Sequence, residues 1–140
     1  MSNILKISEA ASLALHTMTL LAARSDSLFP TGEVASTLQV SEAHLSKVLQ
    51  RLARVGLVKS IRGPKGGFKL SRDGHTITLL EVYEAIEGPL RLGACLMGAP
   101  ICSGNCILGG LVGTINKEVH EYLAKPKLSE LKNVYGRRNA

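Results

Sequence analysis

Three cysteines lie close together in the second half of this chain, and their spacing suits metal chemistry. Six residues separate Cys95 from Cys102, and three separate Cys102 from Cys106. Glycine and proline surround them, so the segment can fold around a bound group. Thiolates are the soft ligands that zinc and iron–sulfur clusters take. The alternatives are a thiol–disulfide switch without metal and three structural thiols.

A four-coordinate site needs one more ligand, from elsewhere in the chain or from a second subunit. Glu9, Ser12 and His16 follow at i, i+3 and i+7, so they share one stripe of a predicted helix. His16 would bind as a neutral imidazole. A histidine among apolar residues is also often a surface side chain without a ligand. The other three histidines fall in segments with other predicted roles.

The distribution of charge indicates a second kind of chemistry. Between Ala43 and Arg72 the chain has eight lysines and arginines and no acidic residue, whereas its net charge is +6. A surface of one sign is what a polyanion such as DNA selects. The alternative is a solvated basic face with no partner.

The same stretch has the pattern of a winged helix-turn-helix, a helix followed by a glycine-tipped hairpin. The first turn of such a helix enters the major groove, where Gln can address adenine and Lys guanine. Arginines further back would hold phosphates, and wing residues would reach a minor groove or flanking backbone. The candidate DNA-binding residues are Ser41, His44, Ser46, Lys47, Gln50, Arg51 and Arg54 in the helix, and Lys59, Arg62, Gly63, Pro64, Lys65, Gly66 and Gly67 in the wing.

Helical periodicity predicts the elements that position these residues. A first helix covers about 8–23, with a core face of Ala11, Leu15, Met18 and Ala22. A second helix covers 32–38 after an N-cap at Thr31. A third begins after the N-cap Ser41, packs through Leu45, Val48, Leu49 and Leu52, and runs to about Val55 before a glycine stop at Gly56.

The sequence pattern after the third helix predicts a wing, a loop and two more helices. The wing strands are 59–61 and 68–70, and Thr78 with Glu81 forms a capping box for a helix that ends before Gly88-Pro89. Residues 90–106 are a loop. A helix over 107–124 has a heptad seam suited to pairing between subunits, although it could pack only on its own domain. The seam residues are Leu108, Val112, Ile115, Val119 and Tyr122, and the glycines that weaken the helix start are Gly109, Gly110 and Gly113.

The predicted fold class is mainly α with a small β-hairpin wing, a winged helix-turn-helix plus a long dimerisation helix. We expect four segments: a DNA-binding domain over 1–88, a cysteine-rich cluster-binding loop over 89–106, a dimerisation helix over 107–125 and a frayed basic tail over 126–140. The N-terminal segment lacks the uninterrupted apolar span of a membrane helix and the pattern of a signal peptide. A cytoplasmic location without membrane contact follows, where thiols stay reduced. No phosphate-binding loop or nucleophile–base pair suggests an enzyme.

The sequence over roughly 5–122 resembles the Rrf-type family of bacterial winged-helix regulators, which includes the iron–sulfur cluster regulator and the nitric-oxide-sensitive repressor. The resemblance rests on Ala14-Leu15-His16, on Gly-Leu-Val after the third helix, on the wing motif Arg-Gly-x-x-Gly-Gly-Phe and on the cysteine loop before a long helix. His16 matches a ligand in a redox-sensing member, whereas Ser12 stands where other members place a carboxylate ligand. The gap between Cys102 and Cys106 is shorter than the family's usual one.

The resemblance implies a homodimer with crossed long helices that binds double-stranded operator DNA. Each subunit would hold a 2Fe–2S or 4Fe–4S cluster through Cys95, Cys102 and Cys106. The fourth ligand varies among related proteins and in some comes from helix one of the other subunit; here it would be His16, with Glu9 or Ser12 as the alternatives. Cluster state would control DNA affinity in response to redox state, nitric oxide or iron–sulfur status. The alternative is a regulator without a cluster, either a thiol switch or a protein stabilised by zinc.

Overall fold

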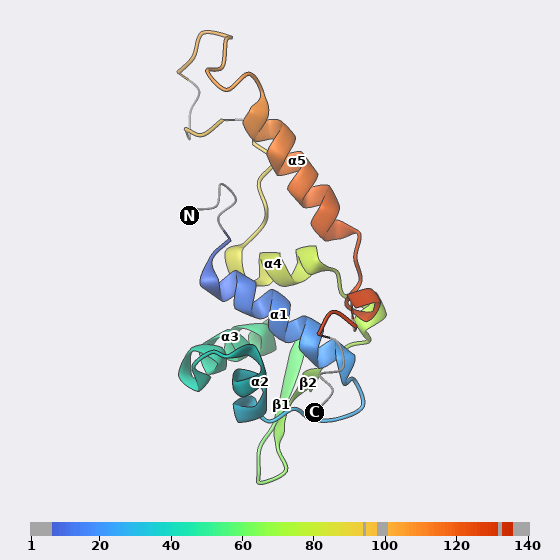
Figure 1. Ribbon diagram of the computed structural model, residues 1–140. Coiled ribbons are helices and arrows are strands. Elements are labelled where there is room, and N and C mark those ends of the chain that lie inside the picture. The colour runs from blue at the N-terminus through green and yellow to red at the C-terminus, as the bar shows by residue number, and fades with distance from the viewer. Residues whose placement is uncertain (1–6, 94, 98–100, 132, 136–140) are drawn as a thin grey trace.

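One long apolar helix, α1 (Glu9–Ala23), lies at the centre of the molecule, and the other elements pack around it (Figure 1). The computed structural model describes residues 7–93, 95–97, 101–131 and 133–135. Helix α1 is buried on most of its circumference, as expected for a helix that is apolar on several faces. Its predicted core residues Ala11, Met18 and Ala22 are buried, while Leu15 is half-buried. The Ser8 hydroxyl caps its first turn by accepting from the Ala11 N–H.

The helix-turn-helix consists of α2 (Thr31–Leu38) and α3 (Glu42–Arg54). Gln39 adopts a left-handed conformation with φ 57° in the turn, and the Ser41 hydroxyl caps α3 by accepting from the His44 N–H at 3.1 Å. The prediction that Thr31 is an N-cap is wrong by one position. Pro30 occupies the boundary because its carbonyl already accepts from the Val34 N–H, so Thr31 is the first helical residue.

The wing is a two-stranded antiparallel hairpin of β1 (Val58–Ile61) and β2 (Gly67–Leu70). Its inner face joins the core through Val58 and Leu70, which are buried. Phe29, in the loop after α1, exchanges two backbone hydrogen bonds with Phe68 of β2. This loop therefore pairs with the hairpin through one isolated antiparallel bridge.

Two further helices follow the wing: α4 (Leu79–Glu87), after a short 3₁₀ turn η1 (Gly74–Thr76), and α5 (Leu111–Ala124). The Thr78 hydroxyl caps α4 by accepting from the Glu81 N–H at 3.1 Å. Figure 1 shows α5 extending away from the helical core, with the cysteine loop at its far end. Helix α5 starts at Leu111 rather than at 107, because Gly109 and Gly110 both have positive φ. Leu108 therefore lies outside the helix that was expected to contain it.

The tail after α5 is docked where the structure describes it, so the prediction of a frayed tail is wrong for 126–131. Leu128, at the start of the 3₁₀ turn η2 (Leu128–Leu131), is completely buried, and its N–H donates to the Ile77 carbonyl. Tyr135 packs against the core, and its hydroxyl donates to the His16 carbonyl at 2.7 Å. An apolar anchor of this kind is enough to order a terminal segment. The basic pair at 137–138 lies outside the described residues.

Candidate functional site

Helix α3 has a buried apolar face and an exposed polar face, as its sequence predicted. Leu45, Val48, Leu49 and Leu52 are each 2% exposed or less. Ser41, His44, Lys47 and Gln50 are exposed, and Ser46 is half-buried. The Ser41 cap fixes the first turn of α3. The side chains proposed to contact bases are therefore held on a rigid, well-packed helix.

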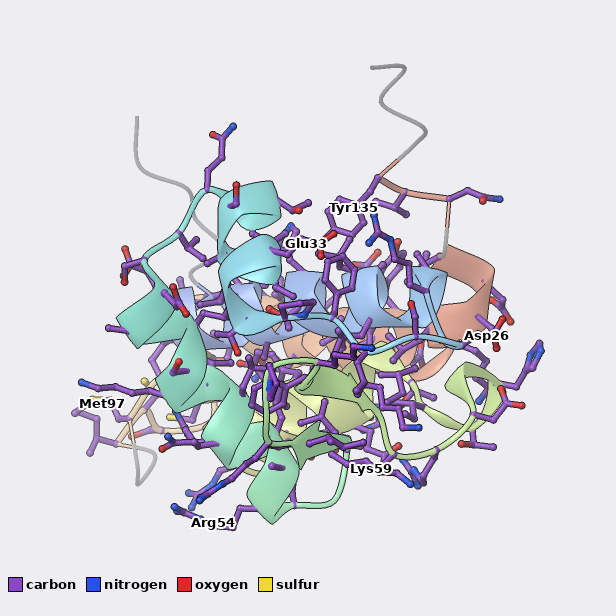
Figure 2. The ribbon with its side chains drawn as sticks, turned by 90° about the horizontal axis from the view of Figure 1, so that it is seen from below. Asp26, Glu33, Arg54, Lys59, Met97 and Tyr135 are labelled. Carbon is purple, nitrogen blue, oxygen red and sulfur yellow. The ribbon has the colours of Figure 1, made fainter. Side chains whose placement is uncertain are left out.

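Arg51 has a structural contact that sequence reasoning missed. Its guanidinium donates to the Ile86 carbonyl near the C-terminal end of α4, so it ties α3 to α4. A cation at a helix C-terminus is also favoured by the helix dipole. Arg54, one turn later, is exposed; Figure 2 looks at the molecule from below and labels it together with Lys59 of the wing.

The wing tip depends on two glycines because the backbone passes too close for a side chain. A Cβ at Gly66 would lie 2.1 Å from the Ile61 carbonyl oxygen, and one at Gly67 would lie 2.5 Å from the Phe29 carbonyl oxygen. Side chains would push these strands apart. Close packing of the backbone thus explains the Gly-Gly pair of the wing motif. Arg62 and Lys65 are exposed at the wing tip.

All three cysteines are free and exposed. The N–H groups of Leu108, Gly110 and Gly109 lower the pKa of the Cys106 thiol, the first of them donating to its Sγ at 3.4 Å. Lowered pKa and exposure are what a metal-binding or reactive thiol needs. Within the described ranges, however, no three His, Cys, Asp or Glu side chains are close enough to hold a metal ion. One chain therefore does not assemble a complete ligand set in this part of the structure.

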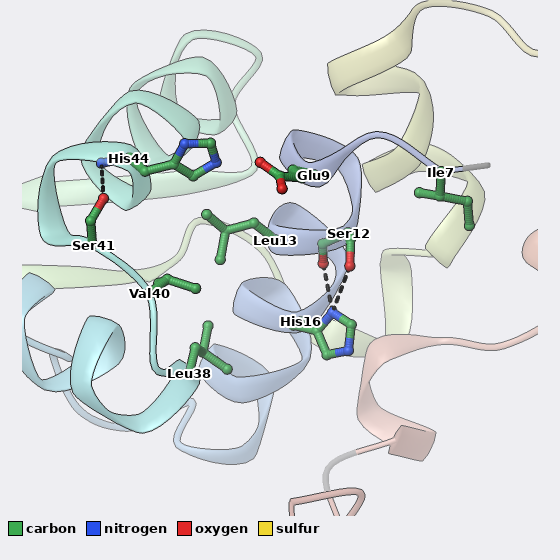
Figure 3. A pocket seen from close by; sticks show the side chains of 9 residues that line it. All are labelled: Ile7, Glu9, Ser12, Leu13, His16, Leu38, Val40, Ser41 and His44. Atoms are coloured by element: carbon green, nitrogen blue, oxygen red, sulfur yellow. Dashed lines mark hydrogen bonds between the residues drawn. The ribbon is translucent and has the colours of Figure 1, made fainter. Parts of the chain in front are cut away.

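The three candidates for the fourth ligand lie together on the wall of one groove (Figure 3). The groove has a volume of about 670 Å³ and an apolar floor that includes Leu13 and Val40. Glu9, Ser12 and His16 of α1 form one side. The opposite side carries Leu38 of α2 and Ser41 and His44 at the start of α3, so a group bound here would touch both α1 and the recognition helix.

His16 is exposed in this groove, and its ring has a defined hydrogen bond. Its Nδ1 lies 2.6 Å from the Ser12 carbonyl oxygen. A carbonyl only accepts, so Nδ1 carries the proton and Nε2 keeps the lone pair of the neutral ring. Metal-binding histidines typically donate the N–H of their other ring nitrogen to a carbonyl or a carboxylate, as Nδ1 does here. The sequence stripe brought Glu9, Ser12 and His16 together correctly, but the groove residues on α2 and α3 could not be inferred from it.

A helix-turn-helix with a basic recognition helix and a basic wing defines a DNA-binding protein of the winged-helix class. The chain belongs to the Rrf2 family, whose model, described as an iron-dependent transcriptional regulator, matches residues 7–133. The protein is therefore a DNA-binding transcriptional regulator and not an enzyme. In the described part of the chain, no helix has both the length and the apolar character needed to span a bilayer.

Individual relatives agree with this assignment. The chain is 30% identical to the transcriptional regulator NsrR of Bacillus licheniformis over 123 residues, which are 85% of this chain and 84% of NsrR. It is 30% identical to the regulator IscR of Xenorhabdus nematophila over 104 residues, 73% of this chain and 63% of IscR. The solved structure of CymR, the global cysteine regulator of B. subtilis, superposes with a TM-score of 0.78 at 28% identity, covering 94% of this chain and 98% of CymR.

Proposed function

We propose that this protein is a homodimeric, cytoplasmic transcriptional regulator whose affinity for its operator is controlled by an iron–sulfur cluster. The observation that carries the proposal is the group of three exposed thiols, one of them with a lowered pKa, in a chain whose family model is described as iron-dependent. The donor set fits a 2Fe–2S or 4Fe–4S cluster, because thiolates are the usual ligands and N–H groups near sulfur tune such sites. When bound, the cluster supplies a centre that responds to electrons, oxidants or nitric oxide.

The roles of the chain's own residues follow from their placement. Cys95, Cys102 and Cys106 would hold the group on the loop, while the N–H groups after Cys106 stabilise its thiolate. Three ligands are supplied by one loop, and the neutral ring of His16 would offer Nε2 from a different element. We assign His16 as the fourth ligand, contributed by the partner subunit, with Glu9 or Ser12 as the alternatives in the same groove.

The groove offers a direct route from the cluster to DNA. A cysteine loop fixed against α1 of the partner would also meet Ser41 and His44, which begin the recognition helix. Releasing the loop would shift the balance between two placements of the recognition helices. A coupling free energy of about 1–3 kcal/mol is enough for regulation.

Dimerisation is proposed through α5. Leu111, Ile115 and Tyr122 are 51%, 37% and 67% exposed and lie on one side of the helix, while Val112 and Val119 beside them are half-buried. Leu108, the first residue of the predicted seam, precedes the helix and is half-buried. Pairing through this strip would place two recognition helices for half-sites about 34 Å apart, one turn of DNA.

The test is anaerobic purification followed by visible absorption and by iron and sulfide analysis. We expect a coloured wild-type protein that contains sulfide, a colourless Cys106→Ser variant and a changed spectrum in His16→Ala. His120→Ala, in α5, is the matched control and should keep the wild-type spectrum. A wild type that stays colourless after cluster reconstitution would exclude the iron–sulfur proposal, and an unchanged His16→Ala spectrum would move the fourth ligand to Glu9 or Ser12.

A second candidate is a thiol switch or zinc site on the same DNA-binding scaffold. The lowered pKa and full exposure of Cys106 favour it, because both increase the reactivity of a thiol. The same purification separates the candidates, since zinc and disulfides give no visible colour.

A further inference from the structure

Two lysines face each other across the root of the wing. In the hairpin, Lys59 of β1 is directly opposite Lys69 of β2. Directly opposed side chains lie on the same face of a sheet, and like charges there destabilise the pair. The only salt bridges formed by the described residues join other side chains, so neither lysine has an acidic partner there. The repulsion between the two lysines does not stabilise the folded chain, and a bound anion would compensate it.

The lysines line a hollow that has room for such an anion. It has a volume of about 310 Å³, and its other walls come from Ser25 in the loop after α1 and from 70–74 after the wing. Arg72 adds a third cation, and its guanidinium is oriented by a salt bridge to Glu81. Asp73 is the single carboxylate in the lining, and its Oδ1 accepts from the His75 N–H at 2.9 Å as the cap of η1. Cations therefore dominate the opening.

The hollow is separated from the wing tip along the hairpin. Lys59 precedes Arg62 by three residues, which span about 10 Å in a strand. That distance corresponds to about three base pairs along one DNA strand. Lys59 is also visible in the view from below that shows Arg54 of the recognition helix (Figure 2). For the lysines to hold a DNA phosphate, one duplex must meet α3, the wing tip and this hollow.

We propose that the hollow lined by Lys59, Lys69 and Arg72 binds a phosphate of the DNA backbone that flanks the operator. This inference rests on the DNA-binding function and adds to it a second anchor at the wing root. Lysine ammonium groups contact phosphates without reading sequence, so the site would set orientation and footprint and not base preference. The protected region should extend about three base pairs beyond the wing-tip contacts.

The experiment measures the salt dependence of binding to a random-sequence DNA duplex by fluorescence anisotropy, which needs no knowledge of the operator. Loss of one phosphate contact lowers the slope of log affinity against log salt by about 1. We expect this change in Lys69→Gln, with a several-fold weaker affinity and a melting temperature that is unchanged or higher, because a repulsive pair is removed. Lys117→Gln removes an exposed lysine of α5 that lies outside the apolar strip. It is the matched control and should keep the wild-type slope.

Other results would overturn the inference. An unchanged salt slope in Lys69→Gln, or a lower melting temperature, would mean that the lysine does not hold a phosphate or serves the fold. Calorimetric titration with tripolyphosphate distinguishes the source of the anion: tight binding that Lys69→Gln abolishes without changing DNA affinity would assign the hollow to a free polyphosphate. A wild type that binds no duplex at all would instead refute the DNA-binding function itself.

Discussion

At the scale of single residues, His16 is the point where several contacts meet. Its ring is oriented by the Ser12 carbonyl, and its own carbonyl accepts from the Tyr135 hydroxyl. The side chain faces the groove that borders the recognition helix. The residue proposed as a ligand is therefore fixed from both sides, by its own helix and by the tail.

The contact made by Tyr135 should make the stability of the protein depend on pH in the alkaline range. Burial raises the pKa of Tyr135 to about 12, against about 10 in an unfolded chain. The unfolded state loses the phenolic proton first, so the contribution of Tyr135 to stability is complete below about pH 10 and is lost as the pH rises through about 12. Tyr135→Phe should cost about 1 kcal/mol at neutral pH through the lost hydrogen bond.

The measurement is urea unfolding of wild type and Tyr135→Phe between about pH 8 and 11.5, with tyrosinate absorbance to follow ionisation. The difference between the two proteins should shrink at the alkaline end. Parallel pH profiles for wild type and Tyr135→Phe would show that Tyr135 has an ordinary environment.

At the scale of secondary structure, local signals predicted most elements, whereas the docked tail was missed because it depends on a long-range contact. The α3 stripe and its Ser41 cap are both encoded within a few residues, so they could be found from periodicity and residue type alone. The docked tail could not, because the Tyr135–His16 contact joins residues 119 positions apart. The later start of α5 follows from glycines that the sequence did show, although their positive φ was not evident.

The helix caps provide a test at this scale. Ser41→Ala should lower the free energy of unfolding by about 1 kcal/mol, because the His44 N–H at the start of α3 loses its acceptor. Thr31→Ala should change it by less than about 0.5 kcal/mol, because Thr31 lies inside α2 and no side-chain cap bond is formed there. Urea unfolding of both variants measures the two changes in the free energy of unfolding. Equal decreases in the two variants would show that Thr31 is a cap after all.

At the scale of the whole molecule, the candidate site could be predicted only in parts. The cysteines and the α1 stripe were evident from spacing, and so was the basic stretch. Their relation was not, because the groove that joins α1 to the start of α3 is created by tertiary packing. Likewise, the opposition of Lys59 and Lys69 depends on the strand register, which the turn geometry sets. Function here is distributed over elements that fold together, and in the proposed dimer a second copy of the chain would complete it.

The proposed pairing of two copies leads to the last prediction. Ile115 lies between Leu111 and Tyr122 on the exposed apolar strip of α5, so a charge there would be buried in a dimer without a partner. Ile115→Glu should therefore sediment as a monomer at concentrations where the wild type is a dimer. Its operator affinity should fall by at least tenfold, since only one half-site is engaged at a time. It should still melt cooperatively, because the substitution lies outside the core around α1.

Lys117→Glu is the matched control, since it places the same charge on the other side of α5 and should remain dimeric. The decisive measurement is sedimentation velocity of both variants, followed by titration against full and half operators. A dimeric Ile115→Glu would show that subunits pair through another surface and would remove α5 as the element that spaces the recognition helices. A monomer that keeps full affinity for the complete operator would refute the requirement for pairing, because cooperative occupation of two half-sites depends on physical linkage.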